Sequence, residues 1–582
     1  MAVRLSTVDI AIIIAYLAVV VALGTVMKRR AAKNIGSYFL GERQLPWWAL
    51  AMSGSSSYFD ITGTMWIVSL FVVIGLKGMW VQWIWGFIIP VFYMAYMGKW
   101  IRRSGVMTGS EWMETRFGSG KAGEAARASY TLYAVLTITA FLAYGATGMG
   151  KFGSVYLPFD EHVCAALIIG ITGTYVILGG FHGVVMVEIF QTVVLSIGAI
   201  IIAYLGFARV SPEMLAAKVG PEWGSLIPKW DCAYLVGTAY EQYKIFGALL
   251  IIWVMKGLLL SLSGPEQLYD FQRFLAAKNP REASKLGALW GVIHTVRWPM
   301  AMGLAVLGIV GLTQQSDPEK VLPSVIQQML PAGLRGFAIA ALLSGFLATF
   351  NSTVNGGASY IVKDIYHKYI NPGASQRNLI YASYISSALL IILGITIGFA
   401  AKSINQMFTW IMTSLGAGVL LPNVLRWYWW RLNGWGYAAG AVSGMLLSLI
   451  QAFVPYFAGL PLFVTFPAIV LLVLAITVAV MLLTEPTDSK TLRKFYAEVR
   501  PAGFWGVVAR DLVGQESALP KRTPFLHDFG NVVLGIPWLI AMWMFPIYLV
   551  LHRFGEASIA AGMVLVISVI LYWTWYRRLE ED

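Results

Sequence analysis

An apolar stretch from Arg335 to Asp364 carries polar side chains of the kind that bind a metal ion inside a membrane. It begins as a helix long enough to cross a bilayer, and its second half holds uncharged polar side chains: Ser344, Thr349, Asn351, Ser352, Thr353 and Asn355. Hydrocarbon does not satisfy that many polar groups, so we expect them to face protein, water or an ion. A hard cation such as sodium prefers oxygen ligands, which hydroxyls and backbone carbonyls supply. The alternative is that each hydroxyl bonds to the carbonyl one turn back.

Small polar residues interrupt a second apolar stretch, 46–74. The run from Ser53 to Ser57 reads SGSSS, a composition that weakens a helix because Ser competes for backbone hydrogen bonds and Gly is flexible. A third stretch, 244–269, contains Gly264 and Pro265, which cannot continue a helix smoothly. Broken helices in matching positions of two inverted repeats indicate a transporter binding site at the membrane midplane. The alternative is that these Gly and Pro residues only pack and kink ordinary membrane helices.

Composition predicts a membrane protein. Hydrophobic residues make up 58% of the 582 residues, and a soluble fold would leave much of that apolar surface facing water. The net charge of +13 comes from basic residues that collect in short loops, where they act as orientation signals, so nucleic acid is not implied as a partner. Cys164 and Cys232 show neither metal-ligand spacing nor a disulfide framework. The sequence contains no nucleotide-binding or metalloprotease motif, so we expect an energy source other than bound nucleotide.

About fifteen apolar segments are each near or above the roughly 20 residues that a membrane-spanning helix needs. They are 8–27, 46–74, 79–98, 125–151, 161–179, 183–207, 244–269, 286–313, 332–362, 378–400, 405–425, 434–456, 460–484, 529–551 and 556–577. An odd number puts the termini on opposite sides. With the N-terminus outside, most of the 42 Lys and Arg residues fall in cytoplasmic loops, as the positive-inside rule requires. We therefore expect a multi-pass protein of the cell membrane with its C-terminus in the cytoplasm.

The two interruptions head the first and sixth spans of a ten-span block, as two five-span inverted repeats require. The predicted division of the chain is an N-terminal helix and basic cytoplasmic loop (1–45), a first inverted repeat (46–207), an external loop (208–243), a second inverted repeat (244–425), two additional helices (426–484), a basic cytoplasmic loop (485–528) and a C-terminal helix pair (529–582). The predicted fold class is an all-α polytopic membrane protein.

Five motifs, spread over residues 46 to 440, resemble those of the sodium:solute symporter family. They are SEWMETRFG (110–118), TYVILGGFHGVVMVEIFQ (174–191), QRFLAAKNPREA (272–283), NSTVNGGASYIVKDIY (351–366) and LRWYWWRLNGWGYAAG (425–440). The resemblance implies the leucine-transporter-type fold. In that fold, two inverted five-helix repeats form a ten-helix core with broken first and sixth core helices. This chain would add one helix before the core and about four after it.

The resemblance also implies a set of sodium ligands. Carried over position by position, they are the carbonyls of Ser56 and Phe59 on the first core helix, and on the eighth core helix the carbonyl of Gly345 with the side chains of Ala348 and Thr349. The family has two adjacent hydroxyls where this chain has Ala348 and Thr349, so one hydroxyl is missing here.

Two questions about that site stay open at the level of sequence. A different anchor for the first core helix shifts its carbonyls to Tyr58 and Ile61. Ser344, Ser352 or a water molecule would have to replace the missing oxygen. A proton-coupled or uncoupled variant is therefore a possible reading.

Candidate solute-binding residues come from the same alignment and from the charges within the membrane. They are Ser57, Tyr58, Asp60, Thr62, Lys256 and Ser263. Sugar-transporting members have amide and acidic side chains where this chain has Tyr58, Thr62, Leu260 and Ser263, so the site looks unlike that of a close sugar transporter. Lys256 either meets an anionic solute or forms an ion pair with Asp60. His294 and Arg297 share one face of a helix, and they either line the cavity or approach the cytoplasmic interface.

The predicted function is secondary-active symport, in which the inward sodium gradient drives uptake of a small polar or anionic solute by alternating access. Na+ and the solute are the expected ligands, and the lipid bilayer is the surroundings. A membrane sensor with this fold is an alternative, but it would call for a cytoplasmic signalling domain. An enzyme would require an acid/base or metal cluster at one depth, and the isolated Asp60, Glu188, Glu266 and Asp270 do not predict one.

Overall fold

The computed structural model of the chain describes residues 5–31, 45–82, 88–106, 108–264, 268–312, 317–401, 403–512 and 524–579. These residues form helices and loops, and their one β-type contact is an isolated bridge between Trp429 and Phe504. The all-α class predicted from the sequence is therefore confirmed for the described part of the chain.

The described helices occupy most of the chain, and a long connection with three short 3-10 turns separates α11 from α12. In the first half they are α1 Thr7–Ala31, α3 Trp47–Ser57, α4 Ile61–Ile74, α5 Gly78–Val81, α6 Ile89–Phe92, α7 Gly98–Arg103, α8 Gly109–Phe117, α9 Lys121–Tyr156, α10 Glu161–Arg209, α11 Pro212–Ala216, α12 Phe246–Ser263, α13 Leu268–Ala276 and α14 Pro280–Ile293. In the second half they are α15 Arg297–Gly311, α16 Val321–Met329, α17 Leu334–Ser359, α18 Gln376–Gly398, α19 Ile404–Trp410, α20 Gly416–Tyr428, α21 Gly434–Phe453, α22 Pro455–Ala458, α23 Leu462–Leu483, α24 Ser489–Val499, α25 Gly506–Arg510, α26 Phe525–Val550 and α27 Phe554–Thr574.

Eleven helices in the described part of the chain are long and apolar enough to cross a membrane. Two further predicted segments are present as shorter apolar helices, Thr7–Leu23 and Glu161–Gly173. The predicted segment 405–425 is helical, with the π-helical residues Ile411–Leu415 between α19 and α20. The remaining segment, 79–98, consists of short helices on either side of residues that lie outside the description. The structure is that of a multi-pass membrane protein.

One difference from the sequence analysis concerns the segments 161–179 and 183–207. The sequence predicts two separate helices there, whereas the structure has the single 49-residue helix α10. At 1.5 Å per residue such a helix is about 74 Å long if straight, more than twice the thickness of the hydrocarbon core. The glycine pair between the two apolar segments therefore does not end the helix.

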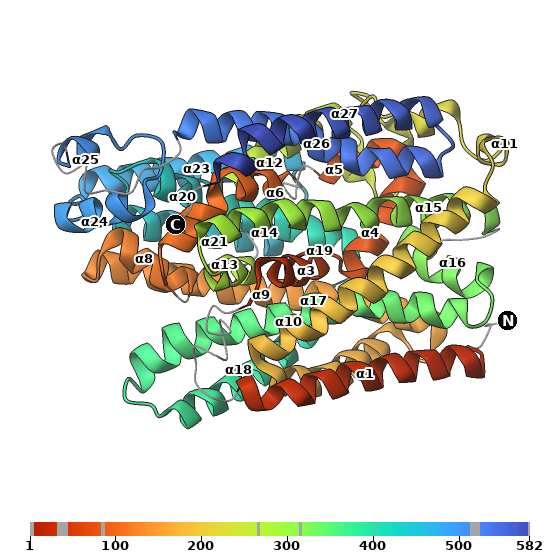
Figure 1. The fold of residues 1–582 in the computed structure, drawn as a ribbon, viewed down its shortest axis with the longest axis horizontal. Coiled ribbons are helices and arrows are strands. Elements are labelled where there is room, and N and C mark those ends of the chain that lie inside the picture. The colour runs from red at the N-terminus through yellow and green to blue at the C-terminus, as the bar shows by residue number, and fades with distance from the viewer. Residues whose placement is uncertain are drawn as a thin grey trace.

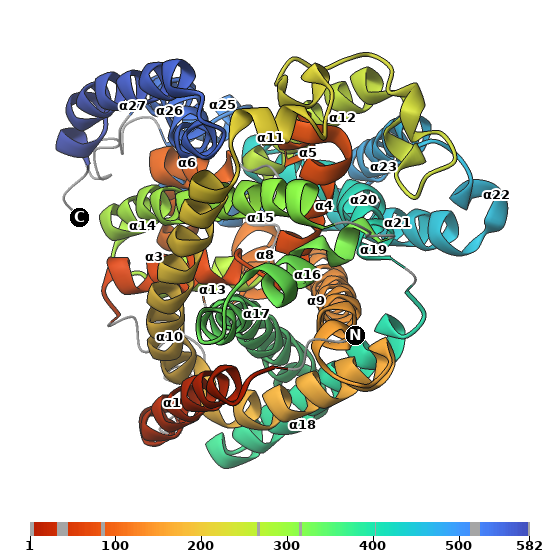
Figure 2. The ribbon, with the colours of Figure 1, turned by 90° about the vertical axis from the view of Figure 1, so that its right-hand side faces the viewer.

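Most long helices run along the longest axis of the molecule (Figure 1). The N-terminal end of α1 and the short helices α11 and α16 lie at one end of this axis. The C-terminus, α8, α24 and α25 lie at the other end. Viewed along this axis, α1 and the pair α26–α27 occupy opposite edges of the bundle (Figure 2).

Both predicted helix interruptions are present. Helix α3 ends at Ser57 and α4 begins at Ile61, so Tyr58, Phe59 and Asp60 form the first break. Asp60 caps α4, because its carboxylate accepts a hydrogen bond from the backbone N–H of Gly63. At the second break α12 ends at Ser263, and Gly264 has a φ of 88°, a left-handed conformation that glycine adopts without steric cost. Pro265 and Glu266 lie outside the described residues.

Candidate functional site

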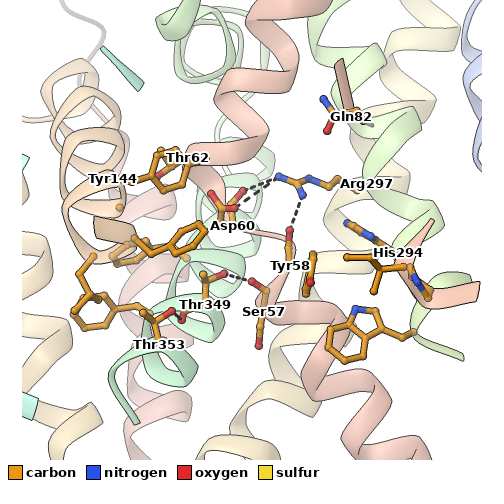
Figure 3. Close-up of a pocket in the computed structure, with 18 of the residues that line it drawn as sticks. Ser57, Tyr58, Asp60, Thr62, Gln82, Tyr144, His294, Arg297, Thr349 and Thr353 are labelled. Atoms are coloured by element: carbon orange, nitrogen blue, oxygen red, sulfur yellow. Dashed lines mark hydrogen bonds and ion pairs between the residues drawn. The ribbon is translucent and has the colours of Figure 1, made fainter. Parts of the chain in front are cut away.

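A cavity lies at the first break (Figure 3). Its wall comes from the α3–α4 break, α9, the α14–α15 junction and α17. The polar or partly polar lining residues are Ser57, Tyr58, Asp60, Thr62, Gln82, Tyr93, Tyr144, His294, Arg297, Thr349 and Thr353. Aromatic and aliphatic side chains complete the wall: Ile89, Pro90, Phe141, Leu142, Trp290, Trp298, Phe346 and Phe350.

The first break and α17 are in close contact at the predicted sodium ligands. The Thr349 Oγ1 atom donates to the Ser57 carbonyl oxygen at 2.6 Å and lies 3.1 Å from the Gly345 carbonyl oxygen. One turn earlier on α17, a Cβ placed on Gly345 would lie 2.0 Å from the Phe59 carbonyl oxygen. Only glycine at position 345 permits this approach, and it brings backbone oxygens of the break against α17.

The sequence left two alignments of the first core helix open, with the carbonyl ligands either at Ser56 and Phe59 or at Tyr58 and Ile61. The contacts with α17 bear on this choice. Phe59 and Ser57 face α17, whereas Ile61 is already the first residue of α4. The contact at Phe59 fits the register with Ser56 and Phe59 as carbonyl ligands. The Ser56 carbonyl itself accepts a hydrogen bond from the Phe59 N–H at 3.0 Å.

Ala348 leaves one hydroxyl missing, and the two serines that the sequence suggested as replacements both make hydrogen bonds of their own. Ala348 is fully buried and has no side-chain oxygen. The Ser344 hydroxyl donates to the Ala340 carbonyl at 2.9 Å, one turn back on its own helix. The Ser352 hydroxyl donates to the Glu188 carboxylate. The oxygens available at this point fit a hard cation in type, since they are carbonyls and a hydroxyl.

The charged group on the other side of the cavity is Arg297. Its Nη1 atom donates to the Tyr58 carbonyl oxygen at 2.5 Å, and its Nη2 atom lies 3.9 Å from Asp60 Oδ2. Both side chains are largely buried, with 8% of the Arg297 side chain and 12% of the Asp60 side chain exposed. Arg297 therefore forms a hydrogen bond to the non-helical backbone of the break and an ion pair with the carboxylate that caps α4.

Four of the six predicted solute-binding residues line this cavity, namely Ser57, Tyr58, Asp60 and Thr62. Lys256 and Ser263 are not among its lining residues. Lys256 Nζ lies 3.7 Å from Met412 Sδ, and the ion pair of Asp60 is with Arg297. The Ser263 hydroxyl donates to the Leu260 carbonyl at 2.8 Å within its own helix.

Comparison with known proteins decides the family. The sodium:solute symporter family profile matches residues 38–448. The chain belongs to this family. Its members are transporters that couple solute movement to sodium, not enzymes.

Several proteins similar to this symporter have known names. Sodium/glucose cotransporter 4 of Danio rerio is 24% identical over 78% of this chain and 73% of its own length. The sodium/glucose cotransporter of Vibrio parahaemolyticus is 24% identical over 78% of this chain and 86% of its own length. The solved structure of a Na+-coupled sialic acid symporter superposes with a TM-score of 0.64, at 18% identity, and covers 83% of this chain and 99% of that chain. That likeness shows a shared fold.

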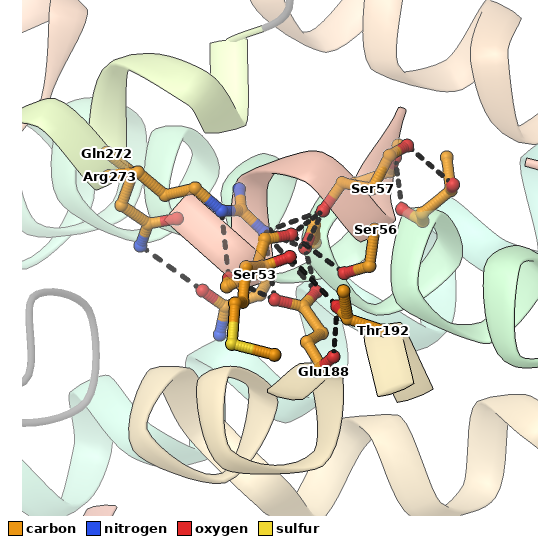
Figure 4. Close-up of polar contacts among 12 residues, drawn as sticks. Ser53, Ser56, Ser57, Glu188, Thr192, Gln272 and Arg273 are labelled. Carbon is orange, nitrogen blue, oxygen red and sulfur yellow. Dashed lines mark hydrogen bonds and ion pairs between the residues drawn. The ribbon is translucent and has the colours of Figure 1, made fainter. Parts of the chain in front are cut away.

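The symporter also has a buried charged cluster that the sequence analysis did not identify (Figure 4). Arg273 on α13 and Glu188 on α10 are both fully buried, with 3.0 Å between Nη2 and Oε2. Arg273 also donates from Nε to the Ser53 hydroxyl at 2.9 Å and from Nη2 to the hydroxyls of Ser57 and Ser352, at 2.7 and 2.6 Å. The hydroxyls of Ser53 and Ser352 in turn donate to Glu188.

The signal for this cluster was present in the sequence, because a carboxylate and a guanidinium within membrane helices each need a partner. Positions 188 and 273 are far apart in the chain, so their pairing was not evident. Ser57 links the cluster to the sodium candidates: its hydroxyl accepts from Arg273, and its carbonyl accepts from Thr349. Hydrogen bonds of Ser57 therefore connect α13 to the first break and to α17.

Proposed function

We propose that this symporter uses the inward sodium gradient to import a small polar or anionic solute by alternating access. The observation that supports this most is the meeting of α17 with the first break beside the cavity, where Thr349 and Gly345 contact the carbonyls of Ser57 and Phe59. Sodium at this point and solute in the adjoining cavity would share one flexible segment of backbone. The relatives named for glucose transport and the sialic acid symporter support a polar or anionic solute.

We propose that sodium is held by the carbonyls of Ser56, Phe59 and Gly345 and by the Thr349 hydroxyl. Because Ala348 has no oxygen, and Ser344 and Ser352 bond elsewhere, the remaining ligands would be water or solute. Bound sodium would link α3 and α4 to α17 through shared ligands. In this way an ion on one side of the break would change the shape of the cavity on the other side.

Contacts at both ends of the cavity support alternating access. On the side of α13, the Tyr58 hydroxyl donates to Asp270 at 2.8 Å, next to the Glu188–Arg273 pair. Toward α19, the Trp66 ring lies 4.2 Å from the Phe408 ring, and its indole N–H donates to the Asn405 side chain at 2.9 Å. For the cavity to open to one side, either the Tyr58–Asp270 contact or the contacts of Trp66 with α19 would have to separate.

The finer architecture belongs to the same proposal. Residues 46–207 and 244–425 would be two inverted five-helix repeats, each opening with an interrupted helix, with the N-terminus outside and the C-terminus in the cytoplasm. In support, the basic segments around α8 and α24 lie at the same end of the molecule as the C-terminus (Figure 1).

Uptake into proteoliposomes tests the function. Radiolabelled glucose, myo-inositol, alanine and propionate would be offered under a sodium gradient, a pH gradient without sodium, or no gradient. Accumulation of at least one solute only with the sodium gradient is expected. Accumulation driven by the pH gradient alone would show proton coupling, equilibration without a gradient would show uncoupled transport, and binding without flux would favour the sensor.

Orientation has its own test in a variant lacking Cys164 and Cys232. A single cysteine at Ser211 should react with a membrane-impermeant maleimide added to intact cells, whereas cysteines at Lys278 and Lys490 should react only after lysis. The reverse pattern at all three positions would invert the proposed topology.

A further inference from the structure

We propose that a second cavity, between α19 and the helices that follow it, binds one molecule of phosphatidylethanolamine, a zwitterionic membrane phospholipid. This cavity has a volume of about 790 Å³, within the roughly 300–1,000 Å³ of small-ligand sites. It shares no lining residue with the cavity at the first break. Three features carry the proposal: its position at the ends of membrane helices, the lipid-facing surfaces around it and one pair of opposite charges.

The cavity lies where several membrane-length helices end. One wall comes from α19 and the middle of α9, and the other from the ends of α18, α21 and α23 with the short α22. In Figure 2, α19, α21, α22 and α23 lie together at one edge of the bundle. Since α18 ends at Gly398, α21 ends at Phe453 and α23 begins at Leu462, this region lies at the depth where helices leave the hydrocarbon. A membrane lipid has its headgroup at that depth.

The surfaces around the cavity face hydrocarbon. In the most apolar stretches of α18, α21 and α23, 33%, 39% and 33% of the residues are buried inside the protein. The connection from α21 to α23 carries aromatic side chains that are 78%, 74% and 41% exposed, at Phe453, Tyr456 and Phe457. Tyrosine is enriched where membrane meets water, and Tyr456 fits that position. Phe453 also lines the cavity, so acyl chains adjoin it.

The charges at the cavity favour a zwitterion. Glu241 and Lys244 are the charged residues among its described lining, and their side chains are 3.0 Å apart, each 44% exposed. The pair is neutral as a whole, so a lipid with a net negative charge would meet Glu241 as well as Lys244. A zwitterionic headgroup matches both charges, because its phosphate accepts from Lys244 Nζ and its ammonium group is attracted to the Glu241 carboxylate.

The other polar lining residues distinguish ethanolamine from choline. The amide side chains of Gln242, Gln406 and Gln451 line the same cavity as the charged pair. A primary ammonium group has three N–H donors, as in lysine, which the carboxylate and the amide oxygens can accept. Choline has no N–H, so it would leave these oxygens without a donor. Ethanolamine is therefore the headgroup that fits this lining.

The cavity and the first break lie on two sides of α19. Asn405 and Phe408 contact Trp66 of α4, whereas Trp410 lines the cavity. The Trp410 indole N–H donates to the Ser448 carbonyl at 3.2 Å, so its ring connects α19 to α21. A bound lipid would therefore contact the helix whose interaction with α4 closes one side of the first-break cavity in the proposed transport cycle.

Native mass spectrometry of the purified full-length protein tests the proposal. Phosphatidylethanolamine, phosphatidylcholine and phosphatidylglycerol with identical acyl chains would be titrated singly into delipidated protein. We expect one high-affinity phosphatidylethanolamine per chain, bound about fivefold or more tightly than either of the other two lipids. The reason is that this headgroup alone combines a matching charge pair with N–H donors.

Two variants test the headgroup and the acyl chain separately. Lys244→Gln removes the phosphate contact and should weaken phosphatidylethanolamine binding about three- to fivefold. Ala452→Trp places a large side chain in the cavity and should abolish high-affinity binding. Lys229→Gln is the control for charge, since Lys229 forms an exposed 3.0 Å pair with Glu222 and is not among the described lining residues. Gly562→Trp on α27 is the control for bulk, because nothing lies within 4 Å of a Cβ there.

Every other outcome overturns the proposal. Tighter binding of phosphatidylglycerol would show that Lys244 binds phosphate without the help of Glu241, and equal binding of the three lipids would show that the headgroup is not selected. Phosphatidylethanolamine binding that persists in Ala452→Trp would place the lipid elsewhere. Because Lys244 is an exposed side chain, the comparison of Lys244→Gln with Lys229→Gln decides the result even if Ala452→Trp does not fold, and equal binding by these two variants rejects the site.

Discussion

The two helix breaks are built differently. At the first, three residues leave the helix, and side chains from three other elements contact them: Thr349 bonds to the preceding carbonyl of Ser57, Arg297 to the carbonyl of Tyr58, and Asp270 to the Tyr58 hydroxyl. At the second, Gly264 turns the chain, and the contact on the last helical carbonyl is an indole N–H, from Trp427 Nε1 to the Ser263 oxygen at 3.0 Å.

The two breaks therefore make different contacts with the rest of the bundle. The first presents carbonyl oxygens to α17 and a capped helix start to the cavity. The second ends α12, and the next described helix is α13, whose Asp270 and Arg273 reach back to the first break. One break lines the candidate site, and the helix after the other break makes hydrogen bonds to it.

The largest effect on the free energy of unfolding is expected at the ion pair between Glu188 and Arg273, which joins the two halves of the chain. Glu188→Gln or Arg273→Gln each leaves a buried charge without its partner, which should lower the free energy of unfolding by about 3–5 kcal/mol. The double variant should lose less than the sum of the two single losses. Unfolding midpoints in detergent provide the measurement, and strictly additive losses would show that the pair is not coupled.

A smaller effect on stability is expected from adding a methyl group where α17 contacts the first break. In Gly345→Ala the new Cβ would overlap the Phe59 carbonyl, so the break must shift, at a cost of about 1–3 kcal/mol. The sodium concentration for half-maximal uptake should rise as well. Gly170→Ala is the matched control on a membrane helix, since nothing lies within 4 Å of a Cβ there. Equal sodium dependence in the two variants would contradict the site.

Thr349→Ala tests one proposed ligand without moving the backbone. Losing a contact of about 1–2 kcal/mol should raise the sodium concentration for half-maximal uptake about 5–30-fold, and Thr349→Ser should retain the wild-type value. Thr396→Ala is the control, because that hydroxyl donates to the Ile392 carbonyl of its own helix and Thr396 is not among the described residues that line the cavity at the first break. Unchanged sodium dependence in a well-expressed Thr349→Ala protein would exclude this threonine as a ligand.

The smallest effect is expected at the second break. Trp427→Phe keeps the aromatic packing against Trp112, at 4.4 Å between ring centres, but removes the hydrogen bond to Ser263. Stability should fall by about 1 kcal/mol, with little change in sodium dependence. A sodium effect as large as that of Thr349→Ala would mean that the second break also belongs to the ion site.

Much of the architecture was predictable because it follows from local composition. Runs of apolar residues predict membrane helices, and the SGSSS run and Gly264 predict the places where two of them end. The candidate ion ligands on α17, Gly345 and Thr349, came from the resemblance to the family, and the structure places both residues beside the first break. Predictions failed where a local signal was outweighed by its surroundings: the glycine pair after Leu178 leaves α10 unbroken.

Amino-acid sequence by itself determined that this chain is an all-α membrane protein with interrupted helices and membrane-embedded charges that need partners. Only tertiary structure decided which charges are partners. Asp60 is paired with Arg297 instead of Lys256, and Glu188 with Arg273, across more than 80 positions of sequence. The physical reason is that a buried charge must find its counter-charge within a few ångströms, and the packing of helices sets which distant residues come that close.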